Sequence, residues 1–136
     1  MPDVISFGEL LIDFVPTVSG VTLSQAEAFK KAAGGAPANV AVGVAKLGVP
    51  SGFMGKVGDD AFGHFLAQTL QAHGVDLRGL RFSKDGQTCL AFVSLRADGE
   101  REFIFYRHRE RDLLLEFAPA EIDPAYIRAA NIFHFG

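Results

Sequence analysis

Residues 34–58 read GGAPANVAVGVAKLGVPSGFMGKVG and contain a helix with an unusual beginning. Two glycines come before Pro37, and proline suits the first turn of a helix, so the helix is expected to start near Pro37. It is expected to run to about Leu47, because Gly48 is a typical helix end. Its small residues would let it lie close to a sheet. Residues 52–57, GFMGKV, then read as a buried strand.

The order of the other expected elements indicates the fold class. Residues 4–7 form a short apolar run closed by Gly8, which predicts a first buried strand. The remaining expected elements are a helix over 61–73 capped at Asp59-Asp60, strands over 88–95 and 102–107 joined in a hairpin at Asp98-Gly99, a short helix over 124–130 and a strand over 131–135. Parallel α/β units rarely contain such a hairpin, so we assign it to a small accessory sheet. Together the elements predict the opening of a doubly wound α/β domain.

The last expected strand has nothing after it to cover it. A doubly wound domain would continue past this strand, so the 136 residues are expected to be the N-terminal part of a longer protein. The alternative is a compact three-stranded domain that ends here.

Composition excludes several classes of function. The net charge is −3 and no block of like charges occurs, so no nucleic-acid partner is expected. Lys46 and several glycines interrupt the apolar stretches well short of the ~18 residues of a membrane span. Cys89 is the single cysteine, which fits a reducing compartment, and the N-terminus has no basic leader, so a cytoplasmic location is expected. The four histidines lack metal-like spacing, and no metal site is expected from them.

Four candidate site positions stand out from the residues alone. Asp13 interrupts the apolar run LLIDFV, so it either has a partner or ligand or is a strand-end residue facing water. An acid just past the end of a core strand would lie where α/β folds bind ligands. Gly34 and Gly35 either admit a ligand close to the backbone or form a tight turn. Asn39 offers a donor and an acceptor, or serves only as a helix cap.

A family resemblance appears at the same stretch. The paired glycines, Asn39, Ala41, Gly48 and Gly58 have the spacing of the N-terminal signature of the ribokinase-like (PfkB) carbohydrate kinases. The segments VISFGELLIDFVP, GDDAFG, LRADGEREFIFYR and IFHFG also resemble that family. The similarity covers essentially the whole chain and is closest to the plant-type fructokinases.

The resemblance implies a doubly wound α/β domain with a small β-sheet lid. Residues 1–136 would form a single incomplete ribokinase-like domain, with lid strands within about 10–33 and 88–107. The family transfers phosphate from ATP, with Mg²⁺, to a sugar hydroxyl, and fructose is the expected sugar here. The residues that would bind it are Asp13, Gly34, Gly35, Asn39 and Arg107. From the sequence alone, Arg107 could equally be a solvated charge at a strand end.

The chain departs from the family at two places. Residues 108–112 read HRERD where plant-type fructokinases usually have Asn-Pro-Ser-Ala-Asp, which affects the exit of the lid. The family's catalytic aspartate, in a Gly-Ala-Gly-Asp motif, does not occur in this sequence. The chain is therefore expected to carry the sugar-binding half of the site, to lack the catalytic base and the ATP site, and to be inactive alone.

Two alternative functions remain open from the sequence. One is a sister kinase for 2-keto-3-deoxygluconate, ribose or a nucleoside. Another is a sugar-binding or partner module without catalysis. Exposed lid strands are natural pairing edges, so a homodimer through the lid is also expected as a possible assembly.

Overall fold

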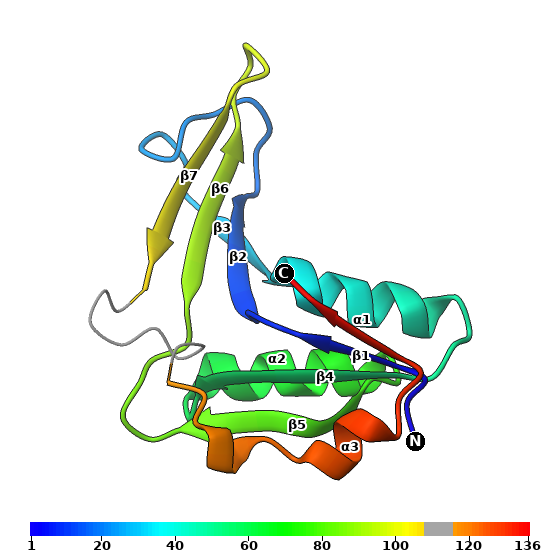
Figure 1. Cartoon of the computed structure of the whole chain (residues 1–136). Coiled ribbons are helices and arrows are strands. Elements are labelled where there is room, and N and C mark those ends of the chain that lie inside the picture. The colour runs from blue at the N-terminus through cyan, green and yellow to red at the C-terminus, as the bar shows by residue number, and fades with distance from the viewer. Residues whose placement is uncertain (108–115) are drawn as a thin grey trace.

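The protein consists of two four-stranded sheets, and the chain passes from one to the other several times (Figure 1). The computed structural model describes residues 1–107 and 116–136, so the altered segment at 108–112 lies outside the described residues. The core sheet contains β1 (Val4–Phe7), β4 (Ser51–Gly58), β5 (Asp76–Ser83) and β8 (Ile132–Phe135). The outer sheet contains β2 (Leu11–Pro16), β3 (Phe29–Gly34), β6 (Leu90–Leu95) and β7 (Arg101–Tyr106).

All four strands of the core sheet are parallel, and the chain adds strands first on one side of β1 and then on the other. The strand order is β5-β4-β1-β8, so the chain moves outward from β1 to β5 and then returns to the other side of β1. Open α/β sheets bind ligands beyond the carboxyl ends of the strands at such a point. This position is where the chain leaves β1 and enters the outer sheet.

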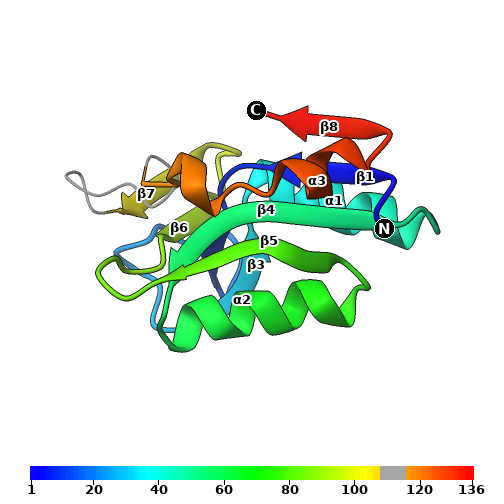
Figure 2. The ribbon, with the colours of Figure 1, turned by 60° about the horizontal axis from the view of Figure 1, so that its bottom comes forward.

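Helices cover both faces of the core sheet. The helices are α1 (Ala36–Lys46), α2 (Ala61–Ala72) and α3 (Pro124–Arg128), with a 3-10 turn at Pro119–Glu121. Phe53, Leu66 and Leu70 are fully buried in the cluster on the α1 and α2 side. Tyr126 of α3 packs on Ile5 and Met54 on the opposite face, and Figure 2 shows α2 and α3 on the two sides of the sheet.

The outer sheet, in the order β3-β2-β6-β7, rises away from the core sheet (Figure 1). β2 and β6 are parallel, and the other two pairs are antiparallel. The hairpin expected at Asp98-Gly99 is confirmed: Gly99 has a φ of 85°, and its N–H donates to the Arg96 carbonyl at 2.9 Å. The same sheet contains β2 and β3, in the stretch over about 10–33 where the family resemblance implies lid strands.

Helix α2 begins as expected at the paired acids. Asp60 is the N-cap, and its carboxylate accepts a hydrogen bond from the Gly63 N–H at 2.8 Å. The same carboxylate accepts from the Thr88 N–H at 2.9 Å and from the Thr88 hydroxyl at 2.7 Å. Asp60 therefore joins the start of α2 to the chain that enters β6.

Two features differ from the sequence-based expectation. Strand β5 was not expected, because Arg78 and Arg81 interrupt its apolar residues and Gly79 lies inside it. Its pairing with β4 also shifts register between Gly52 and Met54, so no clean alternation marks it. The second feature is Asp13, which does not lie just past the end of a core strand: it lies within β2, in the outer sheet.

Candidate sugar-binding site

The site is built where the chain leaves β1 and passes through Glu9 into β2. Gly35, at the start of α1, has a φ of 104°, a region that favours glycine. A Cβ at Gly35 would collide with the Glu9 carbonyl and lie 3.3 Å from the Leu10 Cα. The beginning of α1 can therefore lie against this crossing only because residue 35 has no side chain.

Asp13 and Gly34 are in direct contact. They lie on neighbouring strands, with Leu11 paired to Gly34 and Asp13 paired to Ala32. A Cβ at Gly34 would overlap the Asp13 carboxylate, and it would also lie 3.2 Å from a methyl carbon of Leu11. The bare backbone of Gly34 thus leaves the space that the Asp13 carboxylate occupies.

The surroundings of Asp13 disfavour its charge. Burial, and second the nearby carboxylate of Glu9, raise the pKa of Asp13 above its ordinary value. Within residues 1–107 and 116–136, no N–H or O–H group donates a hydrogen bond to this carboxylate. A half-buried carboxylate without protein donors is suited to accept hydrogen bonds from a ligand.

Arg107 lies at the same end of the outer sheet. Its guanidinium is 3.6 Å from the Glu9 carboxylate and lies over the Phe105 ring, 4.8 Å from the ring centre. Sequence reasoning missed Glu9, although its position two residues after β1 and four before Asp13 is a signal that an acid could be placed at this crossing. Glu9 therefore connects Arg107 with the Asp13 region.

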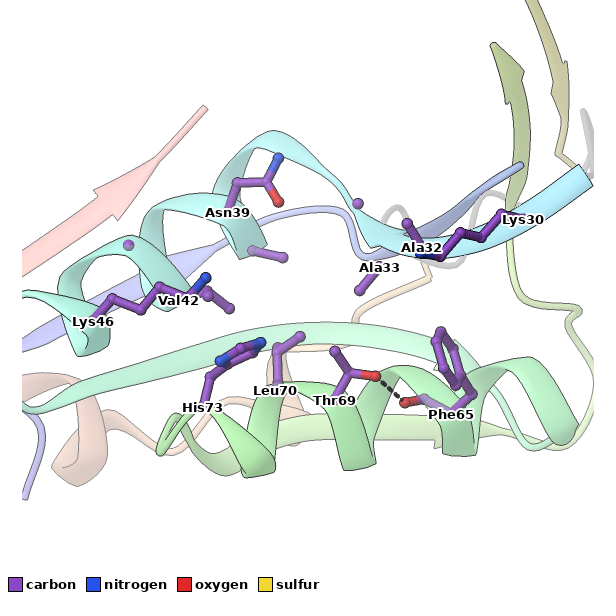
Figure 3. Close-up of a pocket in the computed structure, with 13 residues that line it drawn as sticks. Lys30, Ala32, Ala33, Asn39, Val42, Lys46, Phe65, Thr69, Leu70 and His73 are labelled. Atoms are coloured by element: carbon purple, nitrogen blue, oxygen red, sulfur yellow. Dashed lines mark hydrogen bonds between the residues drawn. The ribbon is translucent and has the colours of Figure 1, made fainter. Parts of the chain in front are cut away.

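Asn39 lies on a different side of the start of α1. Its backbone N–H donates to the Gly35 carbonyl at 2.9 Å, and its side chain is exposed. Figure 3 shows Asn39 beside a hollow between α1 and α2 that Gly34 also lines and Asp13 does not. The structure thus brings Asp13, Gly34 and Gly35 together. Arg107 lies near them through its contact with Glu9. Asn39 is connected to this group only through Gly34, which lines the same hollow, and through the Gly35 carbonyl.

Two kinds of feature are not found among residues 1–107 and 116–136. These residues contain no group of three or more histidine, cysteine, aspartate or glutamate side chains that could hold a metal. Likewise, no helix in the described part of the chain has the length and apolar character needed to cross a bilayer.

Comparisons with known proteins identify the family. The profile of the pfkB family carbohydrate kinases matches residues 1–136. "Fructokinase-2" of Solanum lycopersicum is 59% identical over 133 residues, which are 98% of this chain and 40% of that protein. This chain belongs to the pfkB family of carbohydrate kinases. It spans about 40% of the length of the curated relatives it matches.

Solved structures agree with the architecture. An uncharacterized sugar kinase from Pyrococcus horikoshii, in complex with ATP, matches with a TM-score of 0.87 and 37% identity, covering 98% of this chain and 42% of that one. Fructokinase from Xylella fastidiosa matches with a TM-score of 0.83 and 42% identity, covering 99% of this chain and 41% of that one. The chain therefore has the ribokinase-like α/β fold, in which the outer sheet is the small β-sheet lid.

Proposed function

We propose that this chain forms the sugar-binding part of an ATP-dependent fructokinase that produces fructose 6-phosphate. The single observation that supports this most is the Asp13 carboxylate, half-buried against the backbone of Gly34 and without a described protein donor. A sugar presents several hydroxyl groups, and one carboxylate can accept hydrogen bonds from two of them. The resemblance to curated fructokinases supports fructose as the sugar.

The proposed roles of the other residues follow from their chemistry. Gly34 and Gly35 admit the sugar to the backbone because neither carries a Cβ. Asn39 supplies one donor and one acceptor from the first turn of α1. Arg107, oriented by Glu9, donates to the sugar from the end of β7. The sugar would be held between the outer sheet and α1.

The phosphate half of the reaction is proposed to lie outside this chain. ATP would be the phosphate donor with Mg²⁺, and the residues described here offer no ligand set for the metal. The family's catalytic aspartate motif is absent from the sequence. Residues 1–136 would then be one incomplete ribokinase-like domain of a cytoplasmic enzyme, and the 136-residue chain alone is expected to show no fructose-dependent ATP turnover.

The test measures ADP release by the full-length gene product with fructose, 2-keto-3-deoxygluconate, ribose and a nucleoside. We expect the highest kcat/KM with fructose, and a loss of about 100-fold or more in Asp13→Asn, because charge-assisted hydrogen bonds to the sugar are weakened. Asp59→Asn is the matched control, since among residues 1–107 and 116–136 the Asp59 side chain pairs only with His64, and the change should leave the rate unaltered. A higher rate with another substrate would replace fructose by a sister-kinase function.

Sugar binding without turnover by the full-length protein would instead indicate a non-catalytic binding module. Calorimetry with fructose on the wild type and on Asp13→Asn distinguishes this outcome from a failed assay. No heat from either protein would contradict sugar binding at this site altogether.

A further inference from the structure

A hollow of about 700 Å³ lies between α1 and α2, and we call it the α1–α2 trough. One wall is a stripe of α1 formed by Asn39, Gly43 and Lys46, and the other is a stripe of α2 formed by Phe65, Thr69 and His73. These residues are spaced three or four apart, so each set occupies one face of its helix. Figure 3 shows the two stripes facing each other across the gap.

The trough has a one-sided charge. Lys30, Lys46 and His73 line it, and no aspartate or glutamate belongs to its described lining. This contrasts with the chain as a whole, which has a net charge of −3. Within the described ranges, the side chains of these three basic residues make no ion pair or hydrogen bond. Their donors are therefore available to an anion.

The basic groups stand at the two ends of an apolar middle. Lys46 and His73 point into the gap at one end, and Lys30 lies at the other (Figure 3). Val42 and Leu70 lie between them, and the Thr69 hydroxyl is fixed by donating to the Phe65 carbonyl at 2.8 Å. The lining thus suits an anion that carries an organic body.

Gly43 is a second and independent observation. It lies inside α1, where glycine destabilises a helix relative to alanine. Its helical position needs no positive φ, and a Cβ there would meet no heavy atom of the described chain within 4 Å. Neither backbone conformation nor packing therefore requires glycine at this position. Close approach of a ligand to the backbone of α1 does require a residue without a side chain.

We propose that the α1–α2 trough binds a small organic phosphate. Lys46 and His73 donate to the phosphate oxygens, and the organic body lies along Gly43 over Val42 and Leu70. Sugar phosphates and nucleoside monophosphates share this chemistry. Gly34 and Asn39 line the trough and also belong to the proposed sugar site, but Lys46, His73 and Gly43 do not, and neither Asp13 nor Arg107 lines the trough.

The test follows the backbone amide resonances of Gly43, Lys46 and His73 in the full-length protein during titration. The probes are inorganic phosphate, fructose 6-phosphate and adenosine monophosphate. The Asp13→Asn protein is used, so that binding at the sugar site is weakened. We expect saturable shifts of all three resonances, with at least one organic phosphate binding more tightly than inorganic phosphate; the two organic probes identify which source the site prefers.

Three variants make the outcome decisive. Lys46→Glu should weaken binding at least about tenfold, since it removes a charge-assisted donor and adds a repulsive charge. Gly43→Leu should weaken it similarly by filling the trough. Lys84→Glu, an exposed lysine after β5, is the matched control and should change nothing. Absence of saturable shifts, or equal binding by the wild-type and Lys46→Glu proteins, would overturn the proposal.

Discussion

At the scale of single residues, Gly34 and Gly43 have opposite surroundings within one segment. A Cβ at Gly34 would overlap the Asp13 carboxylate, whereas a Cβ at Gly43 would meet nothing in the described chain within 4 Å. We therefore expect Gly34→Ala to lower the free energy of unfolding by about 1–3 kcal/mol through overpacking. It should also weaken fructose binding at least about tenfold, because Asp13 must move.

Gly43→Ala is the control for this prediction. The same substitution should raise the stability of α1 by up to about 1 kcal/mol, since alanine favours a helix interior. Denaturant unfolding and calorimetry with fructose measure both quantities. Equal stability losses in the two variants would contradict the role assigned to Gly34.

The ionised Asp13 side chain is expected to lower the free energy of unfolding while it strengthens binding of the sugar. Its raised pKa means that the folded protein holds a proton more readily than the unfolded chain, so ionisation of Asp13 costs stability. This cost is absent at a pH below 3.8, the ordinary value of an aspartate, and is complete above the raised value. Asp13→Asn should therefore be more stable than the wild type at pH 7 and lose this advantage at acidic pH, while binding fructose more weakly.

Unfolding curves of both proteins across pH 3 to 7 measure this effect. A constant difference in unfolding free energy over that range would show that burial of the Asp13 charge is not its cause.

The sequence analysis identified Asp13, Gly34 and Gly35 as site candidates because a charge in an apolar run and a glycine pair are local signals. The position of Glu9 just after the first strand is a local signal that was missed, whereas its contact with Arg107 could not be predicted, because these residues are far apart in the chain.

At the scale of elements, the start of α2 depends on Asp60. Burial opposes its ionisation, but hydrogen bonds from Thr88 and Gly63 outweigh this and lower its pKa. Asp60→Ala should cost about 1–2 kcal/mol of stability, as expected for loss of an N-cap. The cost should shrink as the pH falls below 3.8, because protonation weakens the same hydrogen bonds in the wild type.

Asp59→Ala is the matched variant one residue earlier. Asp59 pairs with His64 at 2.7 Å, but the two side chains are 43% and 55% exposed, so its loss should cost less than about 1 kcal/mol. Thermal unfolding of the two variants at pH 7 and pH 3 gives the comparison. A larger loss from Asp59→Ala would contradict the assignment of Asp60 as the cap.

Elements with strong local signals were predicted well, and those defined by pairing were not. The cap at Asp60 and the hairpin at Gly99 are set by nearby residues, and both are confirmed. The position of strand β5 depends on its contact with β4. A Cβ at Gly79 would overlap the Met54 side chain, so the pairing requires glycine there. Such a requirement exists only after the strands have met, so the sequence of β5 does not display it.

At the scale of the whole molecule, the face of the outer sheet that contains Asp13 is apolar and exposed. Phe103 and Phe105 are each 48% exposed on β7, with stacked rings 6.2 Å apart. The sequence analysis expects a possible homodimer through the exposed lid strands, and we propose that this face of the outer sheet forms its contact. Phe105→Ser should raise the dimer dissociation constant at least about tenfold, because aromatic side chains dominate such contacts.

Sedimentation of the full-length protein measures the change. Leu47→Ser is the control, since Leu47 is 84% exposed at the end of α1 and lies outside the outer sheet. A monomer at every concentration, or an equal effect of the two substitutions, would contradict a dimer through this sheet.

The crossing from β1 to β2 also has a mechanical consequence. Asp13 belongs to the outer sheet, whereas Gly35 and Asn39 belong to a helix packed on the core sheet. A sugar that contacts both groups would act as a removable crosslink between the outer sheet and the helix on the core sheet. Filling the site would then limit the angle between the sheets, and small-angle scattering should record a smaller radius of gyration with fructose than without it.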